Sequence, residues 1–183
     1  HHRKKNTGEC KFLEYGSGYS TTFWASKKWI DEVVSIEANP IWADDVKDWI
    51  GQSDLAIQEK INYNVTPVNN QHLLTGLGGF EAWSDQYEEV WQKYSSFAIS
   101  NFKRESFDFI IIDGHDRKRS FINSVPLLKK GGMILCHDMT LETFNALDPV
   151  STLIDTFSNF LEFKEYKNFG HGRGNLGFVG IKS

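Results

Sequence analysis

Two glycines that follow an acid near the start of the chain are the first residues suited to ligand binding. The stretch reads Glu14-Tyr-Gly16-Ser17-Gly18-Tyr-Ser20, and it joins an apolar run to an amphipathic one. Glycines at such a junction permit a sharp turn and let the backbone approach a ligand closely. A strand, a glycine-rich turn and a helix start together make a nucleotide or phosphate cradle. A plain tight turn is the alternative interpretation.

A second acid, Glu37, narrows the class of ligand. It ends the next apolar run about twenty residues further on, where an acid accepts hydrogen bonds from ribose hydroxyls. Thr21 stands where the dinucleotide pattern G-x-G-x-x-G has its third glycine, and Glu14 would repel a pyrophosphate but attract a cationic group. These residues favour a ligand with an amino group, a ribose and no phosphate, which describes S-adenosylmethionine. Solvated charges at two strand ends are the alternative.

Two aspartates and a histidine end later apolar runs. Asp113 ends the run Phe107–Asp113, and His137 with Asp138 ends the next one. Ligands bind outside the carboxyl ends of the strands in an open α/β sheet, so we expect these side chains to converge on one pocket. They are a donor set for Mg²⁺ or another divalent cation, although a nitrogen ligand suits Mg²⁺ less well than oxygen. In the alternative, Asp113 contacts only the cofactor and Asp138 caps the next segment.

His115 follows Asp113 by two residues and is expected to face the same pocket. A histidine that is neutral near pH 7 is suited to remove a proton from a hydroxyl. The candidate catalytic residues are therefore His115, Asp113 and His137, with His137 as the second choice of base. The alternative for His115 is a histidine that only hydrogen-bonds the loop backbone.

The elements that position these residues alternate between short apolar runs and longer amphipathic stretches. This pattern is typical of an α/β domain with a parallel sheet, and we expect one domain over residues 1–183. The expected strands are Lys11–Tyr15, Glu32–Glu37, Ile61–Val68, Phe107–Asp113, Met133–His137, Phe163–Phe169 and Leu176–Lys182. The expected helices are Ser20–Ile30, Ile41–Ile50, Asp85–Asn101, Arg119–Lys129 and Pro149–Phe160.

Residues 76–102 form an insert that is rich in aromatic side chains. The chain as a whole is 14% aromatic. The aromatic residues of the insert are Phe80, Trp83, Tyr87, Trp91, Tyr94, Phe97 and Phe102. Several of them recur every three or four residues, which places them on one face of a helix and indicates packing. The glycine-rich stretch before this helix is expected to form a lid or a wall of the acceptor pocket.

Composition and charge exclude several classes of protein. A net charge of −4 and a pI near 5.9 do not suit a protein that binds a phosphate backbone, so no nucleic-acid partner is expected. Two cysteines are too few for a disulfide framework, which favours a reduced, cytoplasmic compartment. No apolar run approaches the length of a membrane span. The oligomeric state does not follow from the sequence.

Four motifs give the sequence a family resemblance. They are E-Y-G-S-G-Y-S-T from residue 14, V-S-I-E-A-N from residue 34, F-D-F-I-I-I-D-G-H from residue 107 and L-L-K-K-G-G-M-I-L-C-H-D from residue 127. Their order and spacing resemble those of class I S-adenosylmethionine-dependent methyltransferases over roughly residues 10–182. The resemblance implies a Rossmann-like three-layer α/β sandwich. Its sheet would be seven-stranded and mostly parallel, with an antiparallel C-terminal strand.

The same resemblance implies roles for individual residues. The glycine motif would hold the methionine part of the cofactor, Glu37 the ribose, and Ala38 and Asn39 would pack near the sugar and adenine. Small-molecule O-methyltransferases of the catechol and macrolide-sugar types hold Mg²⁺ at these strand ends, which here carry Asp113, His137 and Asp138. Such a metal would lower the pKa of the acceptor hydroxyl. The implied cofactor-binding set is Glu14, Gly16, Ser17, Gly18, Ser20, Glu37, Ala38, Asn39 and Asp113.

The function expected from the resemblance is O-methylation of a small-molecule or sugar hydroxyl, with S-adenosylmethionine as methyl donor. The segment after residue 113 lacks the N-P-P-Y-like tetrapeptide that amino methyltransferases acting on nucleic acid or glutamine carry. The expected partner is therefore a small-molecule acceptor. Two alternatives stay open: a NAD-dependent oxidoreductase and a non-catalytic nucleotide-binding module of the same fold.

Overall fold

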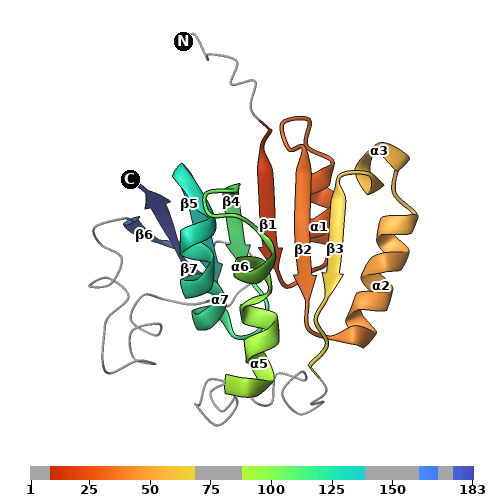
Figure 1. Ribbon diagram of the computed structural model, residues 1–183. Helices are drawn as coiled ribbons and strands as arrows, with labels where there is room; N and C mark the ends of the chain where they lie inside the picture. The colour runs from red at the N-terminus through yellow and green to blue at the C-terminus, as the bar shows by residue number, and fades with distance from the viewer. Residues whose placement is uncertain (1–8, 69–87, 139–160, 169–174) are drawn as a thin grey trace.

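The computed structural model in Figure 1 describes residues 9–68, 88–138, 161–168 and 175–183. The strands are β1 (Lys11–Tyr15), β2 (Glu32–Glu37), β3 (Ile61–Val65), β4 (Phe107–Ile112), β5 (Leu128–His137), β6 (Leu161–Asn168) and β7 (Asn175–Lys182). The helices are α1 (Tyr19–Ala25), α2 (Pro40–Gly51), α3 (Leu55–Gln58), α5 (Glu88–Ser95), α6 (Phe97–Asn101) and α7 (Arg117–Ser124), with a short 3₁₀ helix over Val125–Leu127. None of the helices in these ranges has the length and apolar character needed to cross a membrane.

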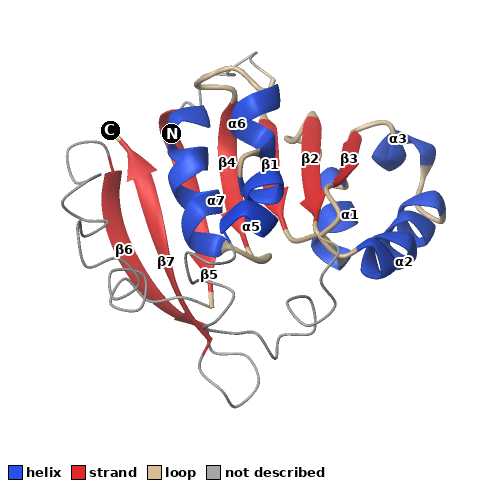
Figure 2. Ribbon diagram, turned by 60° about the horizontal axis from the view of Figure 1, so that its bottom comes forward, coloured by secondary structure: helices blue, strands red, loops and turns tan. Residues whose placement is uncertain are grey.

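These strands form one seven-stranded sheet in the order β3-β2-β1-β4-β5-β7-β6. Neighbouring strands from β3 to β5 run parallel, whereas β7 runs antiparallel to both β5 and β6. Figure 2 shows β6 at one edge of the twisted sheet and β3 at the other. The strand order reverses between β1 and β4, which is the switch point where open α/β sheets bind ligands. The predicted α/β class, mostly parallel with an antiparallel C-terminal strand, is confirmed.

Helices cover both faces of the sheet. In Figures 1 and 2, helices α1, α2 and α3 gather on one side and α5, α6 and α7 on the other. Successive side chains of a strand point to opposite faces, so each face has its own apolar core. In β1, Phe12 packs in a cluster with Ala25 of α1, whereas Leu13 and Tyr15 belong to the cluster that contains Trp91. Burial on both faces explains the near-continuous apolar runs of the central strands.

The segment before β5 differs from its prediction. The sequence pattern predicts a helix over Arg119–Lys129, but α7 covers Arg117–Ser124 and β5 already begins at Leu128. Pro126 explains the early end of the helix. Proline has no N–H group to continue the α-helical hydrogen bonds, and the chain goes on as the 3₁₀ helix over Val125–Leu127.

Two glycines lie inside β5, although the sequence pattern predicts the strand to begin only after them, at Met133. The pairing of β5 with β4 shifts register between Phe107 and Phe109, opposite this part of β5. Gly131 has a φ of +76°, which a residue with a side chain rarely adopts. A Cβ on Gly132 would lie 2.8 Å from the carbonyl oxygen of Lys129. The glycine pair therefore allows an irregularity within the strand.

Helix α1 ends at Ala25, five residues before the predicted end at Ile30. The chain must turn here to enter β2. Lys60 stabilises the turn, because its Nζ donates to the carbonyl oxygens of Lys27 over 3.1 Å and of Ile30 over 2.7 Å. The predicted helix 149–160, residues 76–87 of the insert and part of the turn between β6 and β7 lie outside the described residues.

Candidate active site

The carboxyl ends of β1, β2 and β4 bring the predicted motifs together. Gly16 N donates to the Ile36 carbonyl oxygen over 3.0 Å, and Asp113 N donates to the Tyr15 carbonyl oxygen over 2.9 Å. The loops after these strands therefore lie side by side at one edge of the sheet, the lower edge in Figure 1. The glycine motif and the residues after β4 meet there, as the sequence predicts.

Gly16 and Gly114 touch where two of these loops meet. Gly16 has a φ of +88°, and a Cβ there would lie 2.5 Å from Gly114 N. A Cβ on Gly114 would lie 2.1 Å from the hydroxyl oxygen of Tyr94 and 2.8 Å from Gly16 N. A side chain at either position would push the loops apart, so both positions require glycine. A Cβ on Gly18 would meet only the ring of Trp42, at 3.9 Å, which is an ordinary contact.

Glu37 ends β2 beside the glycine loop, and its carboxylate is buried. Oε2 accepts hydrogen bonds from Ser17 N over 3.0 Å and from Ser17 Oγ over 2.8 Å. Oε1 accepts hydrogen bonds from the backbone N–H groups of Ala38 and Asn39, both over 2.8 Å. Ser17 Oγ also lies 2.8 Å from the hydroxyl oxygen of Tyr63. The acid predicted to bind ribose thus also fixes the glycine loop, and a ribose hydroxyl would have to share Oε2 with Ser17 or replace it.

Glu14 lies on the α1 side of β1, and only 1% of the residue is exposed. Its Oε2 accepts hydrogen bonds from Thr21 Oγ1 over 2.7 Å and from Ser35 Oγ over 2.9 Å, and its Oε1 accepts one from Ser20 Oγ. Burial raises the pKa of Glu14 to about 7, even though the three hydroxyl donors favour the ionised form. Through its hydrogen bonds to Ser20, Thr21 and Ser35, the Glu14 carboxylate links β1 to α1 and β2.

Asn39 and Trp42 attach the start of α2 to the glycine loop. Asn39 is the N-cap of this helix, and its Oδ1 accepts hydrogen bonds from Ile41 N over 3.0 Å and from Trp42 N over 3.3 Å. Trp42 Nε1 donates to the Ser17 carbonyl oxygen over 2.8 Å. Ala38 is fully buried in the core beside Asn39. Both residues lie next to Glu37 as predicted, and their proximity to a sugar and adenine stays a prediction.

Asp113, His137 and Asp138 meet at the ends of β4 and β5, which is the convergence that the sequence predicts. His137 Nδ1 lies 3.0 Å from Asp113 Oδ1 and 3.4 Å from Asp138 Oδ2. One possible ligand atom from each residue lies within 4.8 Å of the others. Within the described part of the chain, His137 Nδ1 is buried without a well-aligned hydrogen bond. The three side chains thus point their possible metal-ligand atoms toward one another. They do not supply His137 Nδ1 with a well-aligned hydrogen bond.

Arg117 adds a positive charge to this cluster. Its Nη2 lies 3.2 Å from the carbonyl oxygen of Asp113 and 3.4 Å from Oδ1 of the same residue. Burial nevertheless raises the pKa of Asp113, and the charge of Asp138 raises it further, against the opposite effect of His137 and Arg117. The cluster therefore holds two carboxylates whose ionised forms a bound cation would stabilise.

His115 stacks on Trp91, with ring centroids 5.1 Å apart and ring planes 24° from parallel. Burial lowers the pKa of His115, so the ring is neutral near pH 7, as a general base must be. Among the described residues the ring makes no hydrogen bond, which does not support the alternative of a histidine that holds the loop backbone. Trp91 and Tyr94 are fully buried, which confirms packing for this part of the aromatic stripe.

Sequence reasoning missed Ser35 and Tyr63. Glu14, Ser35 and Tyr63 occupy one register row across β1, β2 and β3. A buried hydroxyl needs a hydrogen-bond partner, so the serine in the apolar run V-V-S-I was the available signal for Ser35. Tyr63 lies in the polar strand sequence I-N-Y-N-V and offered no comparable signal. Thr21 stood out only as the residue that replaces a glycine, whereas the structure makes it a partner of Glu14.

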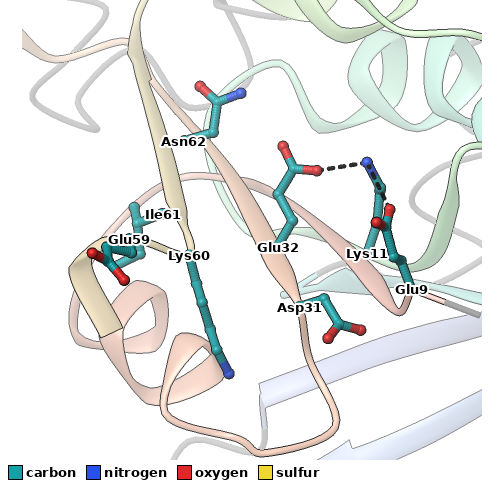
Figure 3. Close-up of a pocket in the computed structure, with 8 residues that line it drawn as sticks. All are labelled: Glu9, Lys11, Asp31, Glu32, Glu59, Lys60, Ile61 and Asn62. Atoms are coloured by element: carbon teal, nitrogen blue, oxygen red, sulfur yellow. Dashed lines mark ion pairs between the residues drawn. The ribbon is translucent and has the colours of Figure 1, made fainter. Parts of the chain in front are cut away.

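A cavity of about 320 Å³ opens at the opposite edge of the sheet, near the starts of β1, β2 and β3 (Figure 3). Both lysines that line it already have partners. Lys11 Nζ lies 2.8 Å from Glu32 Oε2, and Lys60 Nζ binds backbone carbonyls. The cavity is separate from the glycine motif, and we assign it no role. Its lining residues are Glu9, Lys11, Asp31, Glu32, Glu59, Lys60, Ile61 and Asn62.

A family model for a methyltransferase domain matches residues 13–139, which is more than half of the chain. The chain therefore belongs to this methyltransferase family. The prediction of a class I S-adenosylmethionine-dependent methyltransferase is confirmed at this level. No curated protein sequence matches the chain.

Solved methyltransferase structures share the fold. The O-methyltransferase from Bacillus cereus in complex with SAH is 21% identical, with a TM-score of 0.56 over 94% of this chain and 74% of that chain. A methyltransferase-like protein from Silicibacter pomeroyi is 19% identical, with a TM-score of 0.61 over 94% and 78%. The N-methyltransferase NodS from Bradyrhizobium japonicum, in complex with S-adenosyl-L-homocysteine, is 15% identical, with a TM-score of 0.54 over 94% and 78%. Similarity at these identities concerns the fold.

Proposed function

We propose that the protein transfers a methyl group from S-adenosylmethionine to a hydroxyl of a small molecule or sugar. The observation that carries this proposal is the convergence of Asp113, His137 and Asp138 beside the glycine loop. Carboxylates and an imidazole at this place suit an acceptor group that must lose a proton. S-adenosylmethionine supplies the methyl group on a positively charged sulfur, and the protein must hold the two reactants in line.

The residues around the glycine loop fit this cofactor. Gly16 and Gly114 leave the backbone free of side chains where the loops meet, and the Glu37 carboxylate ends β2 next to Ser17. In the proposal, Glu37 holds the ribose, and the other residues of the cofactor cradle are Gly16, Ser17, Gly18, Ser20, Ala38, Asn39 and Asp113.

The donor set at the ends of β4 and β5 also fits a divalent cation. Asp113, His137 and Asp138 would hold it, and the buried His137 Nδ1 without an aligned hydrogen bond is the feature that favours a metal ligand. A nitrogen donor suits transition metals better than Mg²⁺. A cation at this place would lower the pKa of the acceptor hydroxyl.

Two histidines are candidates for the base that takes the acceptor proton. We assign the role to His115, because its ring is neutral near pH 7 and is held in place by the stacking contact with Trp91. His137 is the second candidate for this role. We further propose that the glycine-rich part of the 76–102 insert, which precedes α5 in the sequence, forms a lid or an acceptor wall.

The geometry around Thr21 argues against a NAD-dependent oxidoreductase. Thr21 occupies the position of the third glycine in the dinucleotide pattern, and it is fully buried with its hydroxyl bound to Glu14. A pyrophosphate site at this loop would have to accommodate the negative charge of Glu14 beneath it. Measurement of methyl transfer distinguishes an enzyme from a non-catalytic module of the same fold.

Calorimetry with S-adenosylhomocysteine and with NAD tests the cofactor, and transfer of an isotopically labelled methyl group tests the reaction. We expect binding of S-adenosylhomocysteine and none of NAD, and labelled product from phenol, catechol or sugar hydroxyls. Transfer should be measured after treatment with a chelator, and again after Mg²⁺ or Mn²⁺ is restored. Binding of NAD alone would overturn the proposal. Cofactor binding without transfer to any hydroxyl would leave the non-catalytic module as the better description.

A further inference from the structure

Glu14 is placed by the structure where direct contact with a cofactor is difficult. We propose that Glu14 is a positioning residue, which holds the start of α1 against β2 and acts on the cofactor only through the glycine loop. The motif resemblance implies the opposite, a direct contact with the methionine part. The inference rests on the proposed function, because it concerns the cofactor site of a methyltransferase.

The hydrogen bonds of Glu14 leave little room for a ligand. A carboxylate offers about four acceptor positions. Hydroxyls of Ser20, Thr21 and Ser35 take three of them, and 1% of the residue is exposed. An amino group of a ligand would have to reach an oxygen that lies beneath α1. The three hydroxyls already supply the donors that the buried carboxylate needs.

The same hydroxyls connect Glu14 to the glycine loop. Thr21 Oγ1 donates to Glu14 and accepts a hydrogen bond from Gly18 N over 3.3 Å. Thr21 N in turn donates to the Gly18 carbonyl oxygen over 3.1 Å. Ser20 lies in the same first turn of α1. A change at Glu14 therefore reaches the loop through Thr21, without contact between Glu14 and the ligand.

Glu37 and Glu14 hold the two ends of the loop. Glu37 accepts two hydrogen bonds from Ser17, which directly follows Gly16, and Glu14 binds Ser20 and Thr21, which follow Gly18. Loss of Glu14 should release the α1 end and leave the Ser17 end in place. The expected result is a looser loop and weaker binding of every ligand that the loop contacts.

The test compares Glu14→Gln and Thr21→Val, singly and together, with Thr22→Val as the matched control. The Thr22 hydroxyl lies in the same helix but donates to the Tyr19 carbonyl oxygen. Positioning predicts that Glu14→Gln and Thr21→Val each weaken S-adenosylhomocysteine binding about tenfold, with Thr22→Val near wild type. The effects of substitutions in one hydrogen-bond network are not additive. The double variant should therefore bind S-adenosylhomocysteine only slightly less tightly than the single variant with the lower affinity.

A second ligand separates positioning from direct contact. One test ligand is an S-adenosylhomocysteine analogue without the α-amino group. If Glu14 is a positioning residue, Glu14→Gln should lower the affinity for this analogue and for the parent compound by the same factor. If Glu14 contacts the amino group, the variant would weaken only the parent compound, Thr21→Val would bind normally, and the inference would be overturned.

Amide hydrogen exchange in the free protein keeps this test independent of the proposed function. Faster exchange at Gly18 and Thr21 is expected in Glu14→Gln and in Thr21→Val, and not in Thr22→Val. Unchanged exchange in both variants would refute positioning, even in a protein that binds the cofactor. Failure of the wild-type protein to bind S-adenosylhomocysteine would refute the proposed function, while the exchange result would still decide the role of Glu14.

Discussion

The two halves of the candidate site satisfy their polar groups to different degrees. At the ends of β1 and β2, both oxygens of Glu14 and both oxygens of Glu37 accept hydrogen bonds from the protein, and both residues are buried. At the ends of β4 and β5, the side chains of Asp113 and Asp138 are 45% and 42% exposed. Between them lies the buried His137 Nδ1, which has no aligned hydrogen bond among the described residues.

This difference suits two different tasks. A carboxylate that already accepts several hydrogen bonds from the protein is held in one geometry, so the ends of β1 and β2 are fixed without a ligand. At the ends of β4 and β5, two nearby carboxylates repel each other, and a buried nitrogen without a hydrogen bond costs free energy. A bound cation or an added proton would therefore stabilise this part of the site. We infer that the first half is built for one constant ligand and the second half for a change of protonation during the reaction.

Gly16→Ala is expected to have the largest effect, because it breaks the contact between the two halves. The new Cβ would lie 2.5 Å from Gly114 N at a φ of +88°. Left-handed strain and overpacking together should lower the free energy of unfolding by about 2–5 kcal/mol. Chemical denaturation measures the change. Gly18→Ala is the control, since its Cβ meets only a ring atom at 3.9 Å; equal destabilisation by both variants would contradict the glycine contact.

His137→Ala should lower turnover and leave the affinity for the cofactor nearly unchanged. As a metal ligand or as the base, His137 takes part in removing the acceptor proton, so turnover should fall by about 100-fold or more. The affinity for S-adenosylhomocysteine should stay within about threefold of wild type, because the Glu37 and Ser17 contacts are untouched. Steady-state kinetics and calorimetry measure the two effects. A parallel loss of both would show that the two halves are not separable.

Glu37→Gln should have the converse effect and weaken the cofactor half. Hydrogen bonds to a charged group contribute about 1.5–3 kcal/mol, so the affinity for S-adenosylhomocysteine should fall about tenfold to a hundredfold. Glu32→Gln is the matched control, since it lies in the same strand at the opposite edge and pairs with Lys11. Calorimetry gives the affinities. Unchanged affinity in Glu37→Gln would remove this residue from the ligand site.

A pH dependence of stability is also expected, and it originates at Glu14. The pKa of Glu14 rises from 4.5 to about 7 in the folded protein, chiefly through burial, so the folded state binds more protons between these values. Its contribution to the free energy of unfolding is therefore present below pH 4.5 and is lost as the pH rises to about 7, by up to about 3 kcal/mol. Denaturation of wild type and Glu14→Gln across this range checks the sign: the variant should lose less stability with rising pH.

The sequence predicts the fold and the edge of the sheet where the motifs meet, because both depend on local patterns. Apolar runs mark the strands, and the glycines and strand-end acids mark the edge where they meet. Pro126 marks the end of α7, which the amphipathic pattern alone places too late, at Lys129. These features need only neighbouring residues to be recognised.

The partners of each site residue were harder to predict, since they depend on register and on packing between distant segments. Ser35 meets Glu14 because β1 and β2 pair in one particular register. His115 lies against Trp91 because α5, from the insert before β4, packs beside the loop after β4. Neither contact is visible in sequence spacing.

The contact between Gly16 and Gly114 has a consequence for engineering this protein. The loop after β1 and the loop after β4 share one small volume, so they are not independent modules. A loop from another methyltransferase could replace residues 113–118, to change the acceptor, only if it kept a glycine at the second position. Without it, a graft aimed at new acceptors would first disturb the loop that we propose holds the methyl donor.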